Sequence, residues 1–154
     1  MNVYIPALLI GVVAGLRTMT APAAISWGAH LGWLSLGESA LAFLGSAITP
    51  YIVSVLAILE LVTDQLPKTP SRKVPIQFGA RLFTGGLCGA AIGIAGGALV
   101  GGLVAGIVGA VIGTLGGSAA RARLARAFGR DLPAALIEDA IAIAGAFLIV
   151  ASLA

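Results

Sequence analysis

Residues 82–120 read LFTGGLCGAAIGIAGGALVGGLVAGIVGAVIGTLGGSAA, and this stretch contains no charged residue. A helix that crosses a membrane needs about 20 apolar residues, so a charge-free stretch of this length predicts two spanning helices. We expect a tight turn between them near Gly101 and Gly102. The stretch therefore predicts a transmembrane helical hairpin, which we place at residues 82–118.

Small residues recur every four positions along this hairpin. On a helix, residues i and i+4 lie on one face, so each arm presents a groove without side chains. Faces of this kind pack closely in membranes. We therefore expect a glycine zipper, in which the hairpin packs against itself or against a second copy; a glycine-lined pore is the alternative. The series comprises Gly85, Gly89, Gly93, Gly97 and Gly101, followed in the same phase by Ala105, Gly109, Gly113 and Gly117.

The composition of the whole chain agrees with a membrane environment. Of its 154 residues, 59% are hydrophobic and only 10% are charged, whereas soluble domains carry about 25% charged residues. This excludes a soluble enzyme, a disordered segment and a nucleic-acid-binding domain, and it predicts one all-α, polytopic membrane domain over residues 1–154. The single His30 and the single Cys88 offer neither metal-ligand spacing nor a catalytic pair. We expect no metal, no cofactor and no enzymatic activity.

The first 37 residues allow two interpretations. They form either one long kinked helix with Arg17 inside the membrane, or a broken pair at 3–16 and 18–35 with Arg17 at a cytoplasmic turn. An arginine at mid-membrane costs about 2.5–3.5 kcal/mol on insertion scales, which favours the pair, although its first arm is short for a core of about 30 Å. We favour the broken or re-entrant form.

The remaining spans follow from the other apolar stretches. Residues 39–59 fit one span, and Pro133 lies where the first turn of a final helix would begin. Together with the hairpin and the entry segment, these helices give five or six spans.

Basic residues gather in two segments, 64–81 and 119–131, which lie between apolar stretches. The positive-inside rule places such segments in the cytoplasm, so the hairpin crosses twice between them and the C-terminus lies outside. The same side chains attract anionic headgroups, which makes membrane lipids the expected partners, and we expect no nucleic acid. The headgroup candidates are Lys68, Arg72, Lys73, Arg121, Arg123, Arg126 and Arg130.

Ionisable residues near the ends of apolar helices are the candidates for a functional site, because charged groups inside a membrane are costly and often functional. The carboxylates suit a proton relay or a cation site, or they form structural ion pairs with Arg17 and Arg81. The threonines after Arg17 line such a site or satisfy the backbone groups that Pro22 frees. The candidates are Arg17, Thr18, Thr20, Glu60, Asp64, Arg81, Thr84, Glu138 and Asp139.

A weak internal repeat connects two of these regions. GLRTMT at 15–20 matches GARLFT at 79–84 as G-x-R-x-x-T, and A-x-x-E occurs at 57–60 and again at 135–138. These matches predict duplicated halves at 1–70 and 71–154. In transporters built from duplicated halves, the binding site lies at the interface between the repeats.

Three stretches also resemble a known family. GLRTMTAP at 15–22, DQLPKTP at 64–70 and GAR at 79–81 are similar to a family of small bacterial integral membrane proteins that is defined by a domain of unknown function. The resemblance implies a bacterial inner-membrane protein and brings no substrate or catalytic residue. The leading hypothesis is a transporter or permeation protein for a small solute or ion, with proton coupling through the carboxylates, assembled as a homodimer. The alternative is a structural or anionic-lipid-binding module without transport activity.

Overall fold

The structure, a computed structural model, describes residues 2–64 and 74–154, and all the regular elements in these ranges are helical. This confirms the predicted all-α class. Helices α4, α5 and α6 are long and apolar enough to cross a membrane, while α1 and α3 are shorter apolar helices. The number of spans therefore stays a prediction. The elements are α1 (Tyr4–Leu16), α2 (Thr20–His30), the 3-10 turn η1 (Ala42–Gly45), α3 (Thr49–Thr63), α4 (Pro75–Ala95), α5 (Leu99–Phe128) and α6 (Asp131–Ala151).

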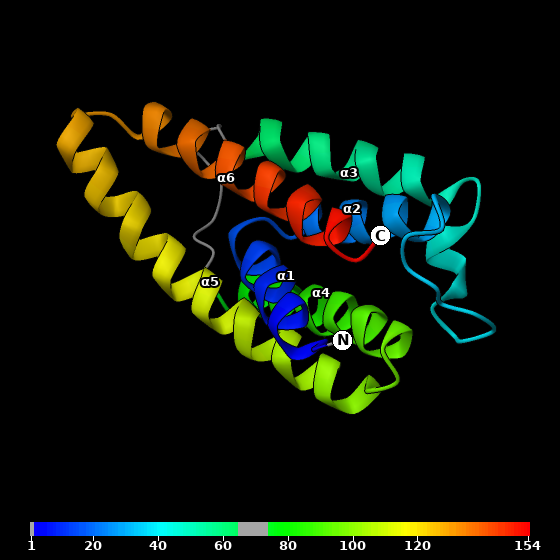
Figure 1. The fold of residues 1–154 in the computed structure, drawn as a ribbon. Coiled ribbons are helices and arrows are strands. Elements are labelled where there is room, and N and C mark those ends of the chain that lie inside the picture. The colour runs from blue at the N-terminus through cyan, green and yellow to red at the C-terminus, as the bar shows by residue number, and fades with distance from the viewer. Residues whose placement is uncertain (1, 65–73) are drawn as a thin grey trace.

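Helices α1, α4 and α5 form the closely packed centre of the fold (Figure 1). Gly89 of α4 faces Gly102 and Gly106 of α5, and a Cβ atom added at Gly89 would lie 2.8 Å from the Cα of Gly106. On another face of α5, a Cβ atom at Gly109 would lie 3.0 Å from the Cα of Gly11 in α1. Carbon atoms ordinarily pack at about 3.5–4.0 Å, so a larger residue at these contacts would push two helices apart.

The glycines of α5 face two different helices. Gly102 and Gly106 face α4, whereas Gly101, Gly109 and Gly113, which belong to the predicted four-residue series, share a face that lies against α1. The glycine zipper along the whole series stays a prediction.

The hairpin itself is confirmed, but its turn lies earlier than we predicted. Helix α4 ends at Ala95 and α5 begins at Leu99, so the chain reverses at residues 96–98 and not at Gly101 and Gly102. Gly97 has φ +76°, a left-handed conformation that glycine adopts without steric cost. The hairpin arms also extend beyond 82–118, because α4 begins at Pro75 and α5 continues to Phe128.

The predicted loop at 119–131 is also wrong, because α5 continues through most of it. Residues 119–128 belong to α5, and only Gly129 and Arg130 separate α5 from α6. Alanine, arginine and leucine are strong helix formers, so the helix continues past its apolar part until Gly129, whose φ is +70°. The expected loop at 64–81 is also shortened, because residues 75–81 are helical; residues 65–73 lie outside the described part of the chain.

The N-terminal half confirms a broken entry segment. Helix α1 ends at Leu16 and α2 begins at Thr20, so Arg17 lies in the break, although α2 ends at His30 and not at residue 35. The predicted span at 39–59 is wrong at its start, since its first ten residues form η1 and turns before α3 begins. Pro50 lies at the start of α3, where its missing N–H has no helical partner to lose. The last helix is as predicted, with Pro133 in its first turn.

Helices α2, α3 and α6 complete the bundle around this centre (Figure 1). The indole N–H of Trp27 in α2 donates to the Ser54 hydroxyl of α3 at 2.9 Å, and the ring of Tyr51 meets the Trp27 ring edge-on at 5.2 Å. Helix α6 packs on α1, α2 and α5. These contacts bring the break at Arg17, the end of α3 and the beginning of α6 together.

Candidate functional site

Arg17 is fully buried and lies at the centre of a group of ion pairs. Its Nη1 lies 2.6 Å from Asp64 Oδ2 at the end of α3, and its Nε donates to Asp139 Oδ1 of α6 at 2.6 Å. Its Nη2 also contacts Asp139, and it lies 3.8 Å from Glu138 Oε2. Arg17 thereby joins three segments that are distant in sequence. The predicted ion pairs with Arg17 are present for Asp64, Glu138 and Asp139, and a role of these carboxylates in a proton relay or a cation site stays a prediction.

Arg121 of α5 extends the same group. Its Nη1 lies 2.7 Å from Asp64 Oδ2 and 3.4 Å from Glu138 Oε2, while its Nη2 lies 2.7 Å from Asp131 Oδ2. We call Arg17, Asp64, Arg121, Glu138 and Asp139 the charged cluster. A guanidinium group can serve several carboxylates because it carries five donors in a fixed plane, and Arg121 uses this property to bridge α3, α5 and α6.

Glu60 is placed differently from the other carboxylates. Its two carboxylate oxygens accept hydrogen bonds from the backbone N–H groups of Thr18 and Met19, each at 2.7 Å. Met19 is the N-cap residue of α2, so Glu60 satisfies donors that would otherwise be unpaired at a helix end. A carboxylate there is also favoured by the positive end of the helix dipole. Glu60 of α3 thus holds the break between α1 and α2 in place.

Arg81 contacts the same break from α4. Its Nη1 donates to the Gly15 carbonyl oxygen at 2.7 Å, and the Thr114 hydroxyl of α5 donates to that same oxygen at 3.4 Å. Arg17 lies in the break between α1 and α2, whereas Arg81 lies within α4. The two G-x-R-x-x-T stretches occupy unlike positions, and the internal repeat stays a prediction.

A polar pocket of about 330 Å³ lies between the break, α3 and α4. Its charged lining residues are Glu60 and Asp64, one turn apart at the end of α3, together with Arg81 of α4. Its size falls at the lower end of the range for small-molecule sites, which is about 300–1,000 Å³. The lining residues are Thr18, Met19, Leu56, Leu59, Glu60, Thr63, Asp64, Gln77, Ala80 and Arg81.

The remaining predicted site residues do not line this pocket. Thr20 is buried in the first turn of α2, and within the described residues its hydroxyl has no hydrogen-bond partner. Thr84 donates to the Arg81 carbonyl of its own helix at 3.2 Å. Lys68, Arg72 and Lys73 lie outside the described residues. In the described ranges, no group of three or more His, Cys, Asp or Glu residues is arranged to hold a metal ion.

Sequence reasoning missed three contributors. Arg121 was expected at lipid headgroups, but it belongs to the charged cluster because its segment is helical and faces α6. The available signal was the sequence separation: Asp131 and Glu138 follow Arg121 by only 10 and 17 positions. Gln77 lines the pocket because α4 begins earlier than expected. Thr114, fully buried on α5, had no sequence signal beyond its polarity in an apolar stretch.

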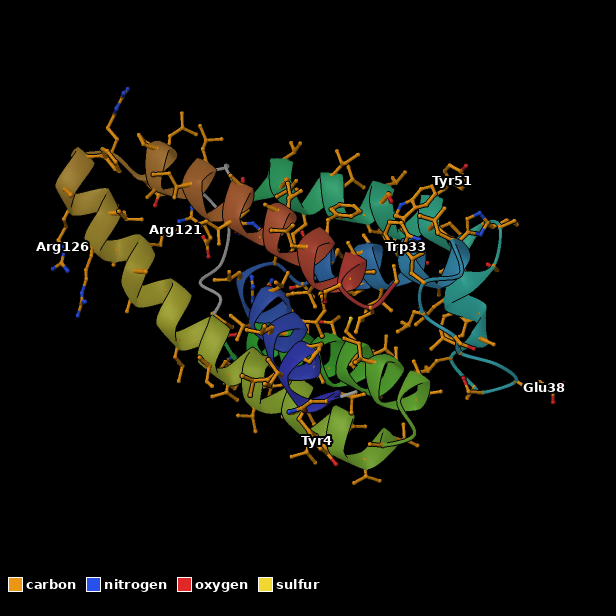
Figure 2. The ribbon with its side chains drawn as sticks, viewed as in Figure 1. Tyr4, Trp33, Glu38, Tyr51, Arg121 and Arg126 are labelled. Atoms are coloured by element: carbon orange, nitrogen blue, oxygen red, sulfur yellow. The ribbon has the colours of Figure 1, made fainter. Side chains whose placement is uncertain are left out.

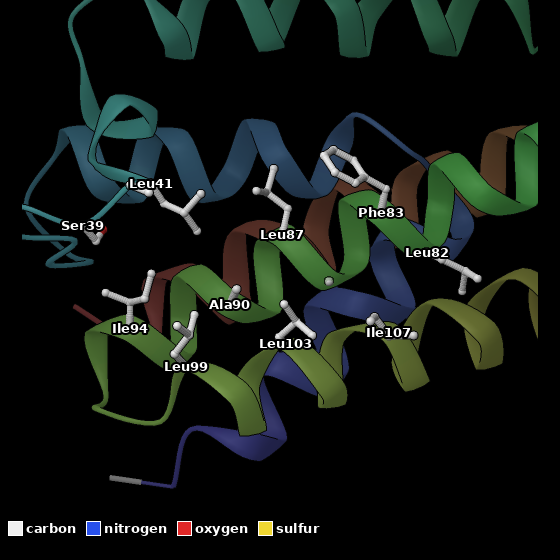
Figure 3. Close-up of a pocket in the computed structure, with 12 residues that line it drawn as sticks. Ser39, Leu41, Leu82, Phe83, Leu87, Ala90, Ile94, Leu99, Leu103 and Ile107 are labelled. Carbon is white, nitrogen blue, oxygen red and sulfur yellow. The ribbon is translucent and has the colours of Figure 1, made fainter.

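A second cavity, of about 460 Å³, has a different chemistry (Figure 3). It lies between α4, α5 and residues 39–41, and Leu87, Leu103 and Ile107 point into it. Ser39 provides the one polar side chain among its lining residues. This cavity can hold an apolar group, but it offers no charge that would orient a polar ligand.

Comparisons with protein-family models, with curated proteins and with solved structures find no match for this chain. The charged cluster and the polar pocket beside it are therefore the features that bear on function.

Proposed function

We propose that this chain is a small multi-pass membrane protein that transports a small polar solute or an ion through the polar pocket. The observation that carries the proposal is the placement of Glu60, Asp64 and Arg81 around a cavity of about 330 Å³ inside an otherwise apolar bundle. Ionisable groups inside a membrane protein mark transport pathways or form structural ion pairs. Here a cavity lies next to the ion pairs, which supports a transport pathway. The carboxylates also provide a place for a coupled proton.

We propose that the protein lies in the bacterial inner membrane with the charged cluster toward the cytoplasm. The arginines at 121–130 support this orientation through the positive-inside rule. Helix α1 begins at the other end of the bundle, where Val3 packs at Gly96 in the turn between α4 and α5. The same orientation therefore puts that turn, the N-terminus and the end of α6 on the outer side. The family resemblance is part of this proposal.

Filling the pocket should stop transport without disturbing the bundle. Ala80 lines the pocket and is itself exposed, so Ala80→Trp is expected to occupy the cavity and lower flux at least about tenfold. The test uses liposomes that contain the purified protein, with a pH-sensitive dye for protons and light scattering for small neutral and zwitterionic solutes. The matched control is Ala140→Trp, an exposed alanine on α6 outside the pocket, which should leave flux unchanged. Absence of flux in the wild-type protein under every gradient would refute transport.

Glu60→Gln separates a role in transport from a role in the fold. Glutamine keeps the size of the side chain, but its amide nitrogen is a donor. One of the two backbone N–H groups that now donate to the carboxylate would therefore face an N–H group in place of an acceptor. Loss of flux at unchanged thermal stability would assign the carboxylate to transport. Loss of stability with flux retained in the surviving folded protein would show that Glu60 acts only as a helix cap.

We further propose that the protein forms a homodimer, which α3 supports. Its outer face carries Tyr51, Val55, Ile58 and Val62, and all four are more than half exposed. They follow one another at helical spacing and so form one apolar face. A protein mass of two chains in the detergent complex, measured by light scattering, is expected, and the double variant Val55→Trp/Ile58→Trp should reduce it to one chain. A wild-type mass of one chain would refute the dimer.

A further inference from the structure

The C-terminal end of α5 and the short turn into α6 carry arginines that do not belong to the charged cluster. Beyond the ion-paired Arg121, the arginines at positions 123, 126 and 130 are all exposed. Figure 2 shows Arg126 pointing away from the bundle, at the end of α5 that diverges from α1 and α4. The sequence from 119 to 130 contains no acidic residue, and Asp131, which follows, pairs with Arg121, so this end is predominantly basic.

The length of α5 sets the depth of this surface in a membrane. With Leu99 at the outer edge of the hydrocarbon, Arg123 and Arg126 lie about 36 and 40 Å along the helix, at 1.5 Å per residue. A typical tilt of about 20° reduces these depths to about 34 and 38 Å. The hydrocarbon is about 30 Å thick, and the headgroup layers extend the bilayer to about 40–45 Å. Counted from the same outer edge, the inner headgroup layer extends from about 30 Å to about 35–38 Å, so Arg123 lies within this layer and Arg126 lies at its far edge.

An aromatic residue accompanies the arginines at this end. Phe128 lies between Arg126 and Arg130 in sequence, and its side chain is 52% exposed. Arginine binds phosphate oxygens with two parallel hydrogen bonds, and an aromatic ring beside basic residues is typical of segments that lie at a membrane interface. The charge of this end and the depth of Arg123 and Arg126 indicate one kind of partner, the anionic headgroups of the inner leaflet.

We propose that Arg123, Arg126 and Arg130 bind the phosphate groups of anionic lipids in the inner leaflet and so fix the end of α5 at the membrane surface. The inference rests on membrane insertion, which is part of the proposed function, but it does not depend on transport. It gives a role to three arginines that do not belong to the charged cluster.

The test measures which lipid the purified protein retains in micelles that contain equal amounts of phosphatidylglycerol and phosphatidylcholine. Mass spectrometry of the protein–lipid complexes should show preferential retention of phosphatidylglycerol. With about 1 kcal/mol per basic residue near an anionic surface, the triple variant Arg123→Gln/Arg126→Gln/Arg130→Gln is expected to lower this preference at least about tenfold. Equal retention of the two lipids by the wild-type protein would overturn the inference.

A second triple variant separates position from charge. Lys68→Gln/Arg72→Gln/Lys73→Gln removes the same charge from the other predicted headgroup candidates, between α3 and α4, and we expect a smaller loss of preference than for the variant at positions 123, 126 and 130. An equal loss in both variants would show a general charge effect and overturn the assignment to α5. Carbonate extraction of cell membranes tests insertion by itself, so a protein that stays in the membrane but shows no lipid preference refutes this inference alone.

Discussion

Replacing Arg17 with glutamine is expected to lower the free energy of unfolding by about 3–5 kcal/mol, because breaking a buried ion pair leaves an uncompensated charge. Arg17 is fully buried, and its removal would take away the cation that Asp64 and Asp139 share, while Asp64 would keep its contact with Arg121. Unfolding of the purified protein by sodium dodecyl sulfate, followed by circular dichroism, measures the change. Arg17→Lys should recover only part of the loss, since an ammonium group cannot reach the carboxylates with a planar set of donors.

The matched control for this experiment is Arg123→Gln, which removes the same charge from an exposed position. Its effect on unfolding should stay within about 0.5 kcal/mol, as for most surface substitutions. If Arg17→Gln were as mild as Arg123→Gln, the charged cluster would not hold α3 and α6 to the break between α1 and α2.

Adding one methyl group at Gly106 is expected to have the second largest effect. Gly106 lies between two helices: a Cβ atom there would lie 2.9 Å from the Cα of Gly89 in α4, while the backbone of Gly106 already touches Gly11 of α1. Backbone atoms cannot rotate away as a side chain can. Gly106→Ala should therefore destabilise the protein by about 3 kcal/mol, the upper end of the usual range for overpacked cores. The same unfolding titration measures the change.

Gly116 provides the control within the same helix. A Cβ atom at Gly116 would meet no atom within 4 Å, so Gly116→Ala should be neutral or stabilise α5 by up to about 1 kcal/mol through helix propensity. Equal destabilisation by the two alanines would mean that the contact of α5 with α1 and α4 is not what makes Gly106 necessary.

The two substitutions show where sequence reasoning was sufficient and where it was not. A four-residue glycine period indicates close packing of helices, but it does not say which helix each face meets. Gly101 and Gly109 lie against α1, whereas Gly102 and Gly106 face α4. A chain of small apolar residues also contains several possible turn positions, and the structure places the turn at residues 96–98.

For the candidate site, the sequence singled out most of the charged residues but not their partners. Arg17, Asp64, Glu138 and Asp139 attract attention because each is a charge near an apolar helix. Arg121 was predicted to contact lipid headgroups, but α5 continues through it and Arg121 belongs to the charged cluster. Glu60 looked like a titrating carboxylate, and the structure shows it as the cap of α2.

The sequence by itself determined the helical class and the apolar character of the chain, because both depend on local composition, and the charge of Arg17 favoured the break that the structure shows there. Tertiary structure decided which charges pair, since Arg17 and Asp139 are 122 positions apart and meet only when α6 packs on α1 and α2. It also decided which glycine faces touch and that a pocket remains beside the ion pairs. Local sequence patterns determine where a helix forms and which of its faces are apolar. Contacts between helices depend on how whole helices are rotated and placed relative to one another, which no short stretch of sequence encodes.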